Sequence, residues 1–292
     1  MPELPEVETV RIGLAALLPG KVVRSTEADW EKSFPNAPTD VQAFLIGAAI
    51  RDVRRRAKVL LIDLNTDYTL VIHLKMTGQL VFRAPSGEHF GAGHPNSSLI
   101  GELPDRSTRV TFVFTDGSKL FFNDQRKFGW VRLLPTVEVP NLDFFQKVGP
   151  EPLADDFTSA DFAARLMRRA NSGIKSVLLD QTVVAGIGNI YADESLWAAK
   201  IHPETKVCDI LSSQLAELFV GLQAVLRLSI EKGGSTDRNY VNAEGKRGSY
   251  LTFANVFRRE GQSCPRCGTT IIKLRVAGRG THICPHCQQS II

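Results

Sequence analysis

The sequence of 292 residues contains no apolar run that reaches the roughly 18 residues needed to cross a membrane. Its first residues are acidic, so a secretory leader, which has a basic start and an apolar core, is not expected. We therefore expect a cytoplasmic protein without a membrane partner. At this length, two domains and a small additional module are expected.

Cysteine is scarce, and four of the five cysteines form two Cys-x-x-Cys pairs near the carboxyl terminus. In a reducing compartment this pattern argues against disulfides and indicates a metal site. Sixteen residues separate the pairs, a spacing typical of a tetrahedral zinc site with the ligands Cys264, Cys267, Cys284 and Cys287. A closed shell of four cysteines leaves no position for catalysis, so we predict one structural Zn²⁺. The fifth, Cys208, is expected to be a small buried residue in a helical stretch.

The excess of positive charge is small, with a formal net charge of +4, but a small total can conceal a basic face. Five basic side chains lie within eight residues, namely Arg51, Arg54, Arg55, Arg56 and Lys58. Such a run is either a solvated face or a surface for a phosphate backbone. Lys58 is next to an apolar strand and is the one we expect to point into a site. The basic residues between the cysteine pairs have two similar interpretations: they bind a polyanion, or the ribbon contacts another protein.

Short strands dominate the first half of the chain. After an amino-terminal helix that ends at Pro19-Gly20, strands are predicted at residues 21–26, 49–56, 59–64, 69–74, 79–83, 109–114, 119–122 and 129–134. One helix, at about residues 40–46, interrupts them. Residues 84–108 are rich in Gly, Pro and Ser and are expected to form a surface loop or to be disordered. The natural architecture for residues 1–134 is an antiparallel β-sandwich or barrel.

The second half of the chain has a helical pattern. Prolines mark residues 135–157 as a linker without regular elements. Helices are predicted at residues 159–170, 174–180, 189–200 and 209–231. We therefore expect an α+β fold, with a helical domain at residues 158–248 and the zinc ribbon, a β-hairpin, at residues 249–292.

The first ten residues offer a candidate catalyst. Removal of Met1 would leave Pro2 as a secondary amine, which can attack an electrophilic carbon and form an iminium ion. The positive end of the following helix should lower the pKa of this amine from its ordinary value of about 7.7–8.0. Glu3 would then be an adjacent proton donor. By itself, however, the stretch is more often an ordinary acidic helix start.

A further candidate is Gly186-Ile187-Gly188-Asn189, which precedes a predicted helix. Glycines allow close approach of the backbone, and the free N–H groups of a helix start bind phosphate. A plain loop with an asparagine cap is an equally good interpretation.

Taken together, these stretches resemble the formamidopyrimidine-DNA glycosylase family, the bifunctional enzymes of base-excision repair. The similarity runs from Met1 nearly to the last residue. It includes the start Met-Pro-Glu-Leu-Pro-Glu-Val-Glu-Thr, the lysine motif at residues 54–58, the helix-two-turn-helix signature at residues 184–192 and the zinc ribbon. The resemblance implies a monomer associated with the nucleoid, acting on damaged double-stranded DNA. It also implies excision of 8-oxoguanine and formamidopyrimidines, followed by β,δ-elimination.

The resemblance also assigns roles to residues. Pro2 is the nucleophile at the sugar C1′, Glu3 the acid that opens the sugar ring, and Lys58 an aid to base release. Because the base must leave the duplex, side chains must fill the gap, and these correspond to Met76, Arg126 and Phe128. Further expected DNA contacts are Arg109, Lys127, Asn189 and Arg279, of which Arg279 also belongs to the catalytic set.

One loop is expected to read the flipped base through Ser235, Thr236, Arg238 and Tyr240, although a Gly-rich segment of this kind is often only a linker. Lys127 departs from the family's usual arginine, so a point charge replaces a planar group. Two alternatives stay open. An endonuclease VIII type would share Pro2, Glu3 and Lys58 but prefer oxidised pyrimidines, and Leu4 argues against it. The second alternative is a catalytically silent DNA-binding protein on the same scaffold, which only an activity assay would exclude.

Overall fold

The computed structural model describes residues 2–94, 96–235 and 250–290, and the chain divides into two compact units. Unit 1 comprises residues 1–146 and 232–249, and unit 2 comprises residues 147–231 and 250–292. Each is described by itself. Among the described residues, no helix has the length and apolar character of a membrane span.

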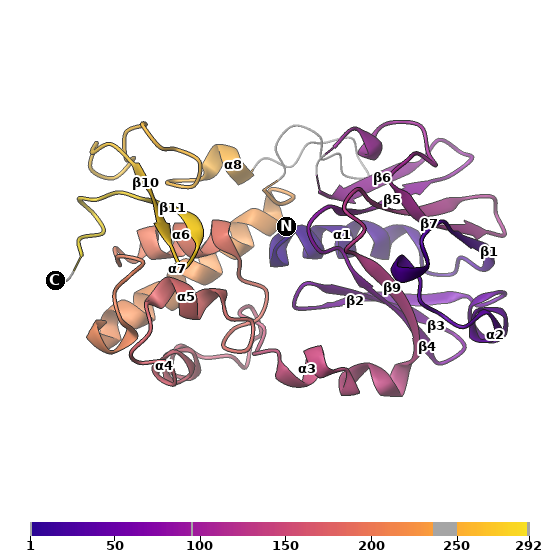
Figure 1. Ribbon diagram of the computed structural model, residues 1–292, viewed down its shortest axis with the longest axis horizontal. Coiled ribbons are helices and arrows are strands. Elements are labelled where there is room, and N and C mark those ends of the chain that lie inside the picture. Colours follow the sequence, from indigo (N-terminus) through magenta and orange to yellow (C-terminus); the bar gives the residue numbers. More distant parts are fainter. Residues whose placement is uncertain (1, 95, 236–249, 291–292) are drawn as a thin grey trace. The chain divides into compact units, whose positions relative to one another are not determined.

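Unit 1 is built on two antiparallel sheets (Figure 1). The first has the strand order β1-β7-β8-β5-β6, with bounds Val23–Ala28, Thr108–Phe114, Lys119–Asp124, Gly78–Arg83 and His89–Gly93. The second has the order β2-β3-β4-β9, with bounds Ile50–Arg56, Val59–Leu64, Tyr68–His73 and Trp130–Pro135. Their facing apolar side chains form one buried core, so the prediction of an antiparallel β-sandwich is confirmed.

Helix α1 (Leu4–Leu17) closes one edge of the sandwich, where it contacts the edge strands β2 and β6. Val7, Val10 and Leu14 are fully buried at helical spacing and join the core. Gly13 lies against the ring of Phe90 so closely that a Cβ would be 2.1 Å from it. The sequence therefore builds a helix whose apolar face, together with one glycine, fits the sheet edge.

The interpretation of residues 84–108 as an irregular loop is wrong. They contain strand β6 and the 3₁₀ turn η3 (Ser97–Leu99), and Leu99 packs with Val81 and Phe121 in a small core of their own. Strand β6 escapes prediction because Gly91, Ala92 and Gly93 lack the bulky side chains by which strands are recognised.

The remaining short elements of unit 1 lie between the strands and after them. They are η1 (Glu31–Ser33), α2 (Pro38–Asp40), η2 (Val41–Leu45), which is π-helical, and η4 (Thr136–Asn141). Helix α3 (Asp143–Lys147) follows η4, so the expected linker carries two short helical elements despite its prolines.

Unit 2 packs helices around the core made by α6 (Asn189–Ala198) and α7 (Ser212–Glu231). The other elements are α4 (Ser159–Met167), α5 (Ile174–Leu179), η5 (Val207–Asp209), α8 (Tyr250–Phe253) and the hairpin β10 (Ile272–Val276) and β11 (Arg279–Ile283). Cys208 lies in η5 and is exposed, so its predicted burial is wrong. The α7 helix begins only after this turn, which leaves Cys208 on the surface.

Candidate functional site

The amino-terminal residues form a buried helix start. Pro2 is buried, and Glu3, with 4% of its surface exposed, is the N-cap of α1. The backbone N–H of Glu3 donates to Glu6 Oε2 at 2.8 Å, and the Glu3 side chain accepts from the helix backbone in return. This reciprocal capping box holds the backbone next to Pro2 at the positive end of the helix.

Lys58 lies in the tight turn between β2 and β3, where the preceding Ala57 has a φ of 53°. Arg55 attaches this turn to α1, because its Nε donates to Glu8 Oε2 at 2.8 Å and its guanidinium also donates to the carbonyl of Ala57 at 2.8 Å. Lys58 itself is buried, with 6% exposed. Helix α1 and the turn that carries Lys58 are thus held together.

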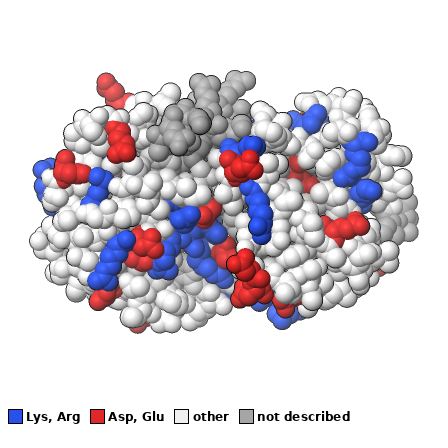
Figure 2. Space-filling model, turned by 180° about the vertical axis from the view of Figure 1, so that it is seen from behind, with Lys and Arg blue, Asp and Glu red and all other residues white. Residues whose placement is uncertain are grey.

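Other members of the basic run bind acidic partners within the protein. Arg54 forms two hydrogen bonds with the Asp63 carboxylate, one of them 2.8 Å long, and Arg51 pairs with Asp67 at 3.1 Å. Basic and acidic side chains are also interspersed on the face shown in Figure 2. These ion pairs support the interpretation of Arg51 and Arg54 as a solvated face.

His73, at the end of β4, was not singled out from the sequence. Its burial lowers its pKa to about 3, and the positive charges of Lys75 and Lys58 act in the same direction. Its Nδ1 accepts from the Lys75 backbone N–H at 3.0 Å, which requires a neutral ring. A neutral histidine therefore lies within the electrostatic reach of Lys58. The only signal in the sequence is its place two residues before Lys75 and three before Met76.

The expected wedge side chains lie on two loops of unit 1. Met76, with 38% exposed, lies between β4 and β5, and Phe128, with 53% exposed, lies between β8 and β9. The Arg126 guanidinium lies 4.8 Å from the centre of the Phe128 ring. Exposed apolar side chains beside an arginine suit insertion between bases. Lys127 Nζ instead lies 4.3 Å from the centre of the Trp30 ring.

Arg109 is not presented to DNA as expected. It has only 4% of its surface exposed, its Nε donates to the Asp124 carbonyl at 2.9 Å, and its NH1 donates to Asp29 Oδ2 at 2.6 Å. A third bond, at 2.7 Å, goes to the Arg106 carbonyl. Because the guanidinium is used inside the protein, we correct its role to a structural one.

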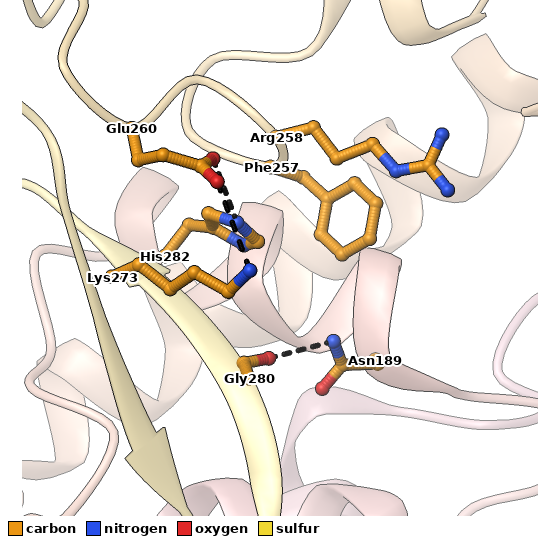
Figure 3. A pocket seen from close by; sticks show the side chains of 7 residues that line it. All are labelled: Asn189, Phe257, Arg258, Glu260, Lys273, Gly280 and His282. Carbon is orange, nitrogen blue, oxygen red and sulfur yellow. Dashed lines mark hydrogen bonds and ion pairs between the residues drawn. The ribbon is translucent and has the colours of Figure 1, made fainter.

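Asn189 and Arg279 lie close together in unit 2. Asn189 begins α6, and its Nδ2 donates to the carbonyl of Gly280, the residue after Arg279, at 2.9 Å. Arg279 is exposed at the start of β11. Asn189 and Gly280 also line a cavity of about 490 Å³, together with Phe257, Arg258, Glu260, Lys273 and His282 (Figure 3). The two predicted phosphate ligands are therefore brought to one place.

A buried network of hydrogen bonds, which was not predicted from the sequence, supports the region around Asn189 and Arg279. Lys175 Nζ donates to Asp193 Oδ1 and to the Thr281 hydroxyl, both at 2.6 Å. The other oxygen of Asp193 accepts from the His282 backbone at 2.9 Å. The network joins α5 and α6 to β11, two residues beyond Arg279.

The four paired cysteines form one cluster, as predicted. Their Sγ atoms all lie within 4.8 Å of one another, close to the separation of about 3.8 Å that tetrahedral Zn–S bonds of about 2.3 Å require. Burial raises the pKa of Cys287 to about 12, whereas hydrogen bonds with Thr269 lower the pKa of Cys267 to about 6. A cation that deprotonates all four thiols suits this ligand set. The site is that of one structural Zn²⁺.

The expected base-reading loop is described only at its start. The Ser235 backbone N–H donates to Glu6 Oε1 at 2.8 Å, so the start of the loop is bonded to the first turn of α1. Thr236, Arg238 and Tyr240 lie outside the described residues.

Comparison with known proteins decides the family. Residues 1–131 match the formamidopyrimidine-DNA glycosylase N-terminal domain, residues 148–240 its H2TH domain, and residues 261–289 the zinc finger found in FPG and IleRS. The formamidopyrimidine-DNA glycosylase of Herpetosiphon aurantiacus is 44% identical over 99% of this chain and 100% of its own length. The chain belongs to the formamidopyrimidine-DNA glycosylase family. It is accordingly an enzyme, a DNA glycosylase with abasic-site lyase activity.

Other members of the formamidopyrimidine-DNA glycosylase family agree. The protein of that name from Pediococcus pentosaceus is 41% identical over 99% of each chain. The Lactococcus lactis enzyme, solved with DNA containing an abasic site, is similar with a TM-score of 0.86 at 35% identity over 99% of this chain and 100% of the other. A MutM structure with carbocyclic 8-oxo-G DNA gives 0.85 at 35% identity, with the same coverage. The predicted family and fold are confirmed.

Proposed function

We propose that this glycosylase removes oxidised purines, 8-oxoguanine and formamidopyrimidines, from damaged duplex DNA with Pro2 as its nucleophile. The observation that carries the proposal is the buried start of α1, where the capping box holds Glu3 next to Pro2 and Arg55 attaches the Lys58 turn to the same helix. Solved relatives contain Fapy-type and 8-oxo-G DNA, which supports this substrate class. Since its substrate is genomic, we place the protein at the nucleoid in the cytoplasm, as a monomer.

Pro2 and Glu3 carry out the chemistry at the sugar. The Pro2 nitrogen attacks C1′ and loses its N–H proton, the bond from C1′ to the base breaks, and the base leaves with the bonding electron pair and takes up a proton. Glu3 protonates the ring oxygen while the nitrogen lone pair forms the iminium double bond, which opens the sugar. The iminium makes a C2′ proton acidic, and its loss eliminates the 3′ phosphate and leaves a C2′–C3′ double bond. Conjugation through this double bond makes the C4′ proton acidic, and its loss eliminates the 5′ phosphate. Water finally releases Pro2.

Positioning falls to the other candidate residues. Met76, Arg126 and Phe128 fill the gap left by the flipped base, because unstacking at a few kcal/mol must be compensated by inserted side chains. Asn189, at the start of α6, and the exposed Arg279, at the start of β11, hold phosphates next to the lesion. Lys58 aids base release.

Borohydride trapping on duplex DNA containing 8-oxoguanine tests the proposal. The wild-type enzyme should give a covalent complex, and Pro2→Gly should lose it. Trapping of Pro2→Gly at the wild-type level, or active protein that retains Met1 by mass spectrometry, would remove Pro2 from this role. A catalytically silent DNA-binding protein would bind the duplex and give no covalent complex.

Oxidised pyrimidines are a second candidate substrate class. A Lactococcus lactis Fpg complex with DNA containing an oxidised pyrimidine is similar to this chain at 34% identity and a TM-score of 0.85. The same trapping assay on an oxidised pyrimidine opposite guanine would measure the ratio of the two activities.

A further inference from the structure

The two loops that carry the wedge residues share an unusual backbone feature. Lys75, which precedes Met76, has a φ of 51°, and Lys127, between Arg126 and Phe128, has a φ of 59°. A residue with a side chain pays roughly 1–2 kcal/mol in this left-handed conformation. Such conformations persist where surrounding bonds impose them. Bonds from other residues must therefore hold both loops in this conformation.

The carboxylate of Asp124 holds the second loop. Asp124 ends β8 and is fully buried. Its Oδ1 accepts from the Arg126 backbone N–H at 3.1 Å, and its Oδ2 accepts from the backbone N–H groups of Phe128 at 2.8 Å and Gly129 at 2.6 Å. One side chain thus fixes the path of the backbone on both sides of Lys127.

Thr77 joins the first loop to the second. It follows Met76, has 8% of its surface exposed, and donates from its hydroxyl to Asp124 Oδ1. The same hydroxyl accepts from the Arg126 backbone N–H at 3.1 Å. The neighbouring Gly78 is the register partner of Asp124 between β5 and β8. A hydroxyl next to one wedge residue is therefore bonded to the backbone of another.

We propose that Thr77 and Asp124 are positioning residues, which tie Met76, Arg126 and Phe128 into one wedge that opens the duplex without taking part in the chemistry at the sugar. The inference rests on the wedge residues assigned under "Proposed function". Closure of the 124–129 loop does not account for the bonds of the Thr77 hydroxyl, because the two hydrogen bonds to Asp124 Oδ2 already close that loop. The Thr77 hydroxyl adds a connection between loops that are far apart in the sequence.

The hydrogen bonds by which Thr77 and Asp124 connect the two loops are called the tie below. Its physical purpose is that the three wedge side chains insert into the duplex at the same time. A base that leaves the stack costs a few kcal/mol, and the gap is filled only if the inserting side chains occupy it together. Loops that moved independently would insert at separate times, and each would lose the contacts made by the other. Hydrogen bonds buried in a low-dielectric interior keep two loops in one arrangement more firmly than exposed ones.

Thr77→Val tests the tie, because it removes the hydroxyl and keeps the shape of the side chain. Thr77→Ser retains the hydroxyl and is the matched control. Single-turnover excision of 8-oxoguanine paired with cytosine should fall on the order of 10-fold in Thr77→Val, since small misplacements of positioned groups have effects of this size or larger. Cleavage at a preformed abasic site has no base to evert and should stay within about twofold of wild type. Thr77→Ser should behave as wild type on both substrates.

A direct measure of duplex opening completes the experiment. A 2-aminopurine beside the lesion brightens when it unstacks, and in Thr77→Val this rise should be slower in stopped flow, while far-UV circular dichroism matches wild type. Equal losses on both substrates, no loss on either, or a Thr77→Ser defect as large as that of Thr77→Val would each overturn the tie. Asp124→Asn, in which one carboxylate oxygen becomes a donor, should reproduce the paired-lesion defect.

The Met76→Ala variant separates this inference from the assignment beneath it. If Met76→Ala excises the paired lesion at the wild-type rate, the wedge assignment fails and the tie has nothing to position. If Met76→Ala is slow and Thr77→Val is not, the wedge assignment stands and the tie is wrong. Slow excision by both variants supports the tie.

Discussion

Lys175 and Asp193 form an ion pair of 2.6 Å in which neither side chain has any exposed surface. Removal of one partner from a buried pair leaves an uncompensated charge, which typically costs 3–5 kcal/mol. We therefore expect Lys175→Ala to lower the free energy of unfolding by about 3–5 kcal/mol in urea denaturation. Lys273→Ala is the control, because the ion pair of Lys273 with Glu260 is exposed and 3.7 Å long, so its loss should change the free energy of unfolding little. A Lys175→Ala effect no larger than the control's would contradict the expectation.

The buried, neutral His73 should make stability depend on pH. Its pKa is about 3 in the folded protein and close to 6.5 when unfolded, so between these values the unfolded state binds more protons. Stability is thus fully present above pH 6.5 and is lost as the pH falls towards 3. At pH 5 the loss should be about 2 kcal/mol, from 1.36 kcal/mol per pKa unit. His73→Asn keeps an acceptor for the Lys75 N–H and should have a flatter profile of free energy of unfolding against pH.

His89→Asn is the control for that measurement, since His89 is exposed. Its pH profile should coincide with that of the wild type. A His73→Asn profile as steep as the wild type between pH 6.5 and pH 5 would show that His73 is not the group responsible.

Glu3→Gln should separate binding from chemistry. The amide keeps the shape of the side chain and can no longer deliver a proton, so base release should fall by about 10²- to 10⁴-fold, the range of general acid catalysis. Affinity for lesion DNA, measured by fluorescence anisotropy, should change little. Undiminished base release in single-turnover assays would exclude Glu3 as the acid.

Loss of zinc should act on DNA binding through the hairpin that carries Arg279. Metal binding and folding are coupled in such modules, so Cys264→Ser should lose zinc and DNA affinity more than helical circular dichroism. Cys208→Ser is the matched control, because Cys208 is exposed and outside the cluster, and it should retain one zinc by atomic absorption. Full DNA affinity in a zinc-free preparation would contradict the role of the ribbon.

Deletion of residues 235–240 tests the base-reading loop. If the loop reads the flipped base, excision of 8-oxoguanine should fall far more than excision of formamidopyrimidine or cleavage of an abasic site, because the amine of Pro2 is retained. Equal loss on all three substrates would indicate a role in folding. Unchanged activity on all three would make the segment a linker.

Features that depend on neighbouring residues or on fixed spacing could be predicted from the amino-acid sequence. The four cysteines fall in pairs whose spacing defines a zinc site, and the apolar positions of α1 repeat at the helical period, so both could be predicted from local chemistry. The strands with bulky alternating side chains were predicted within a few residues of their observed bounds. Pro2, Glu3 and Lys58 were singled out because they belong to short motifs.

Features that depend on partners far apart in the chain became evident only in the folded protein. Arg109 was expected to contact DNA, but Asp29 and the Asp124 backbone hold its guanidinium inside the protein. Strand β6 forms because β5 pairs with it and α1 covers it, although its own residues favour no strand. Likewise, Thr77 meets Asp124 only because β5 and β8 lie side by side. Hydrogen-bond partners brought together by sheet pairing leave no periodic trace in a sequence, and for this reason the pairing had to be observed.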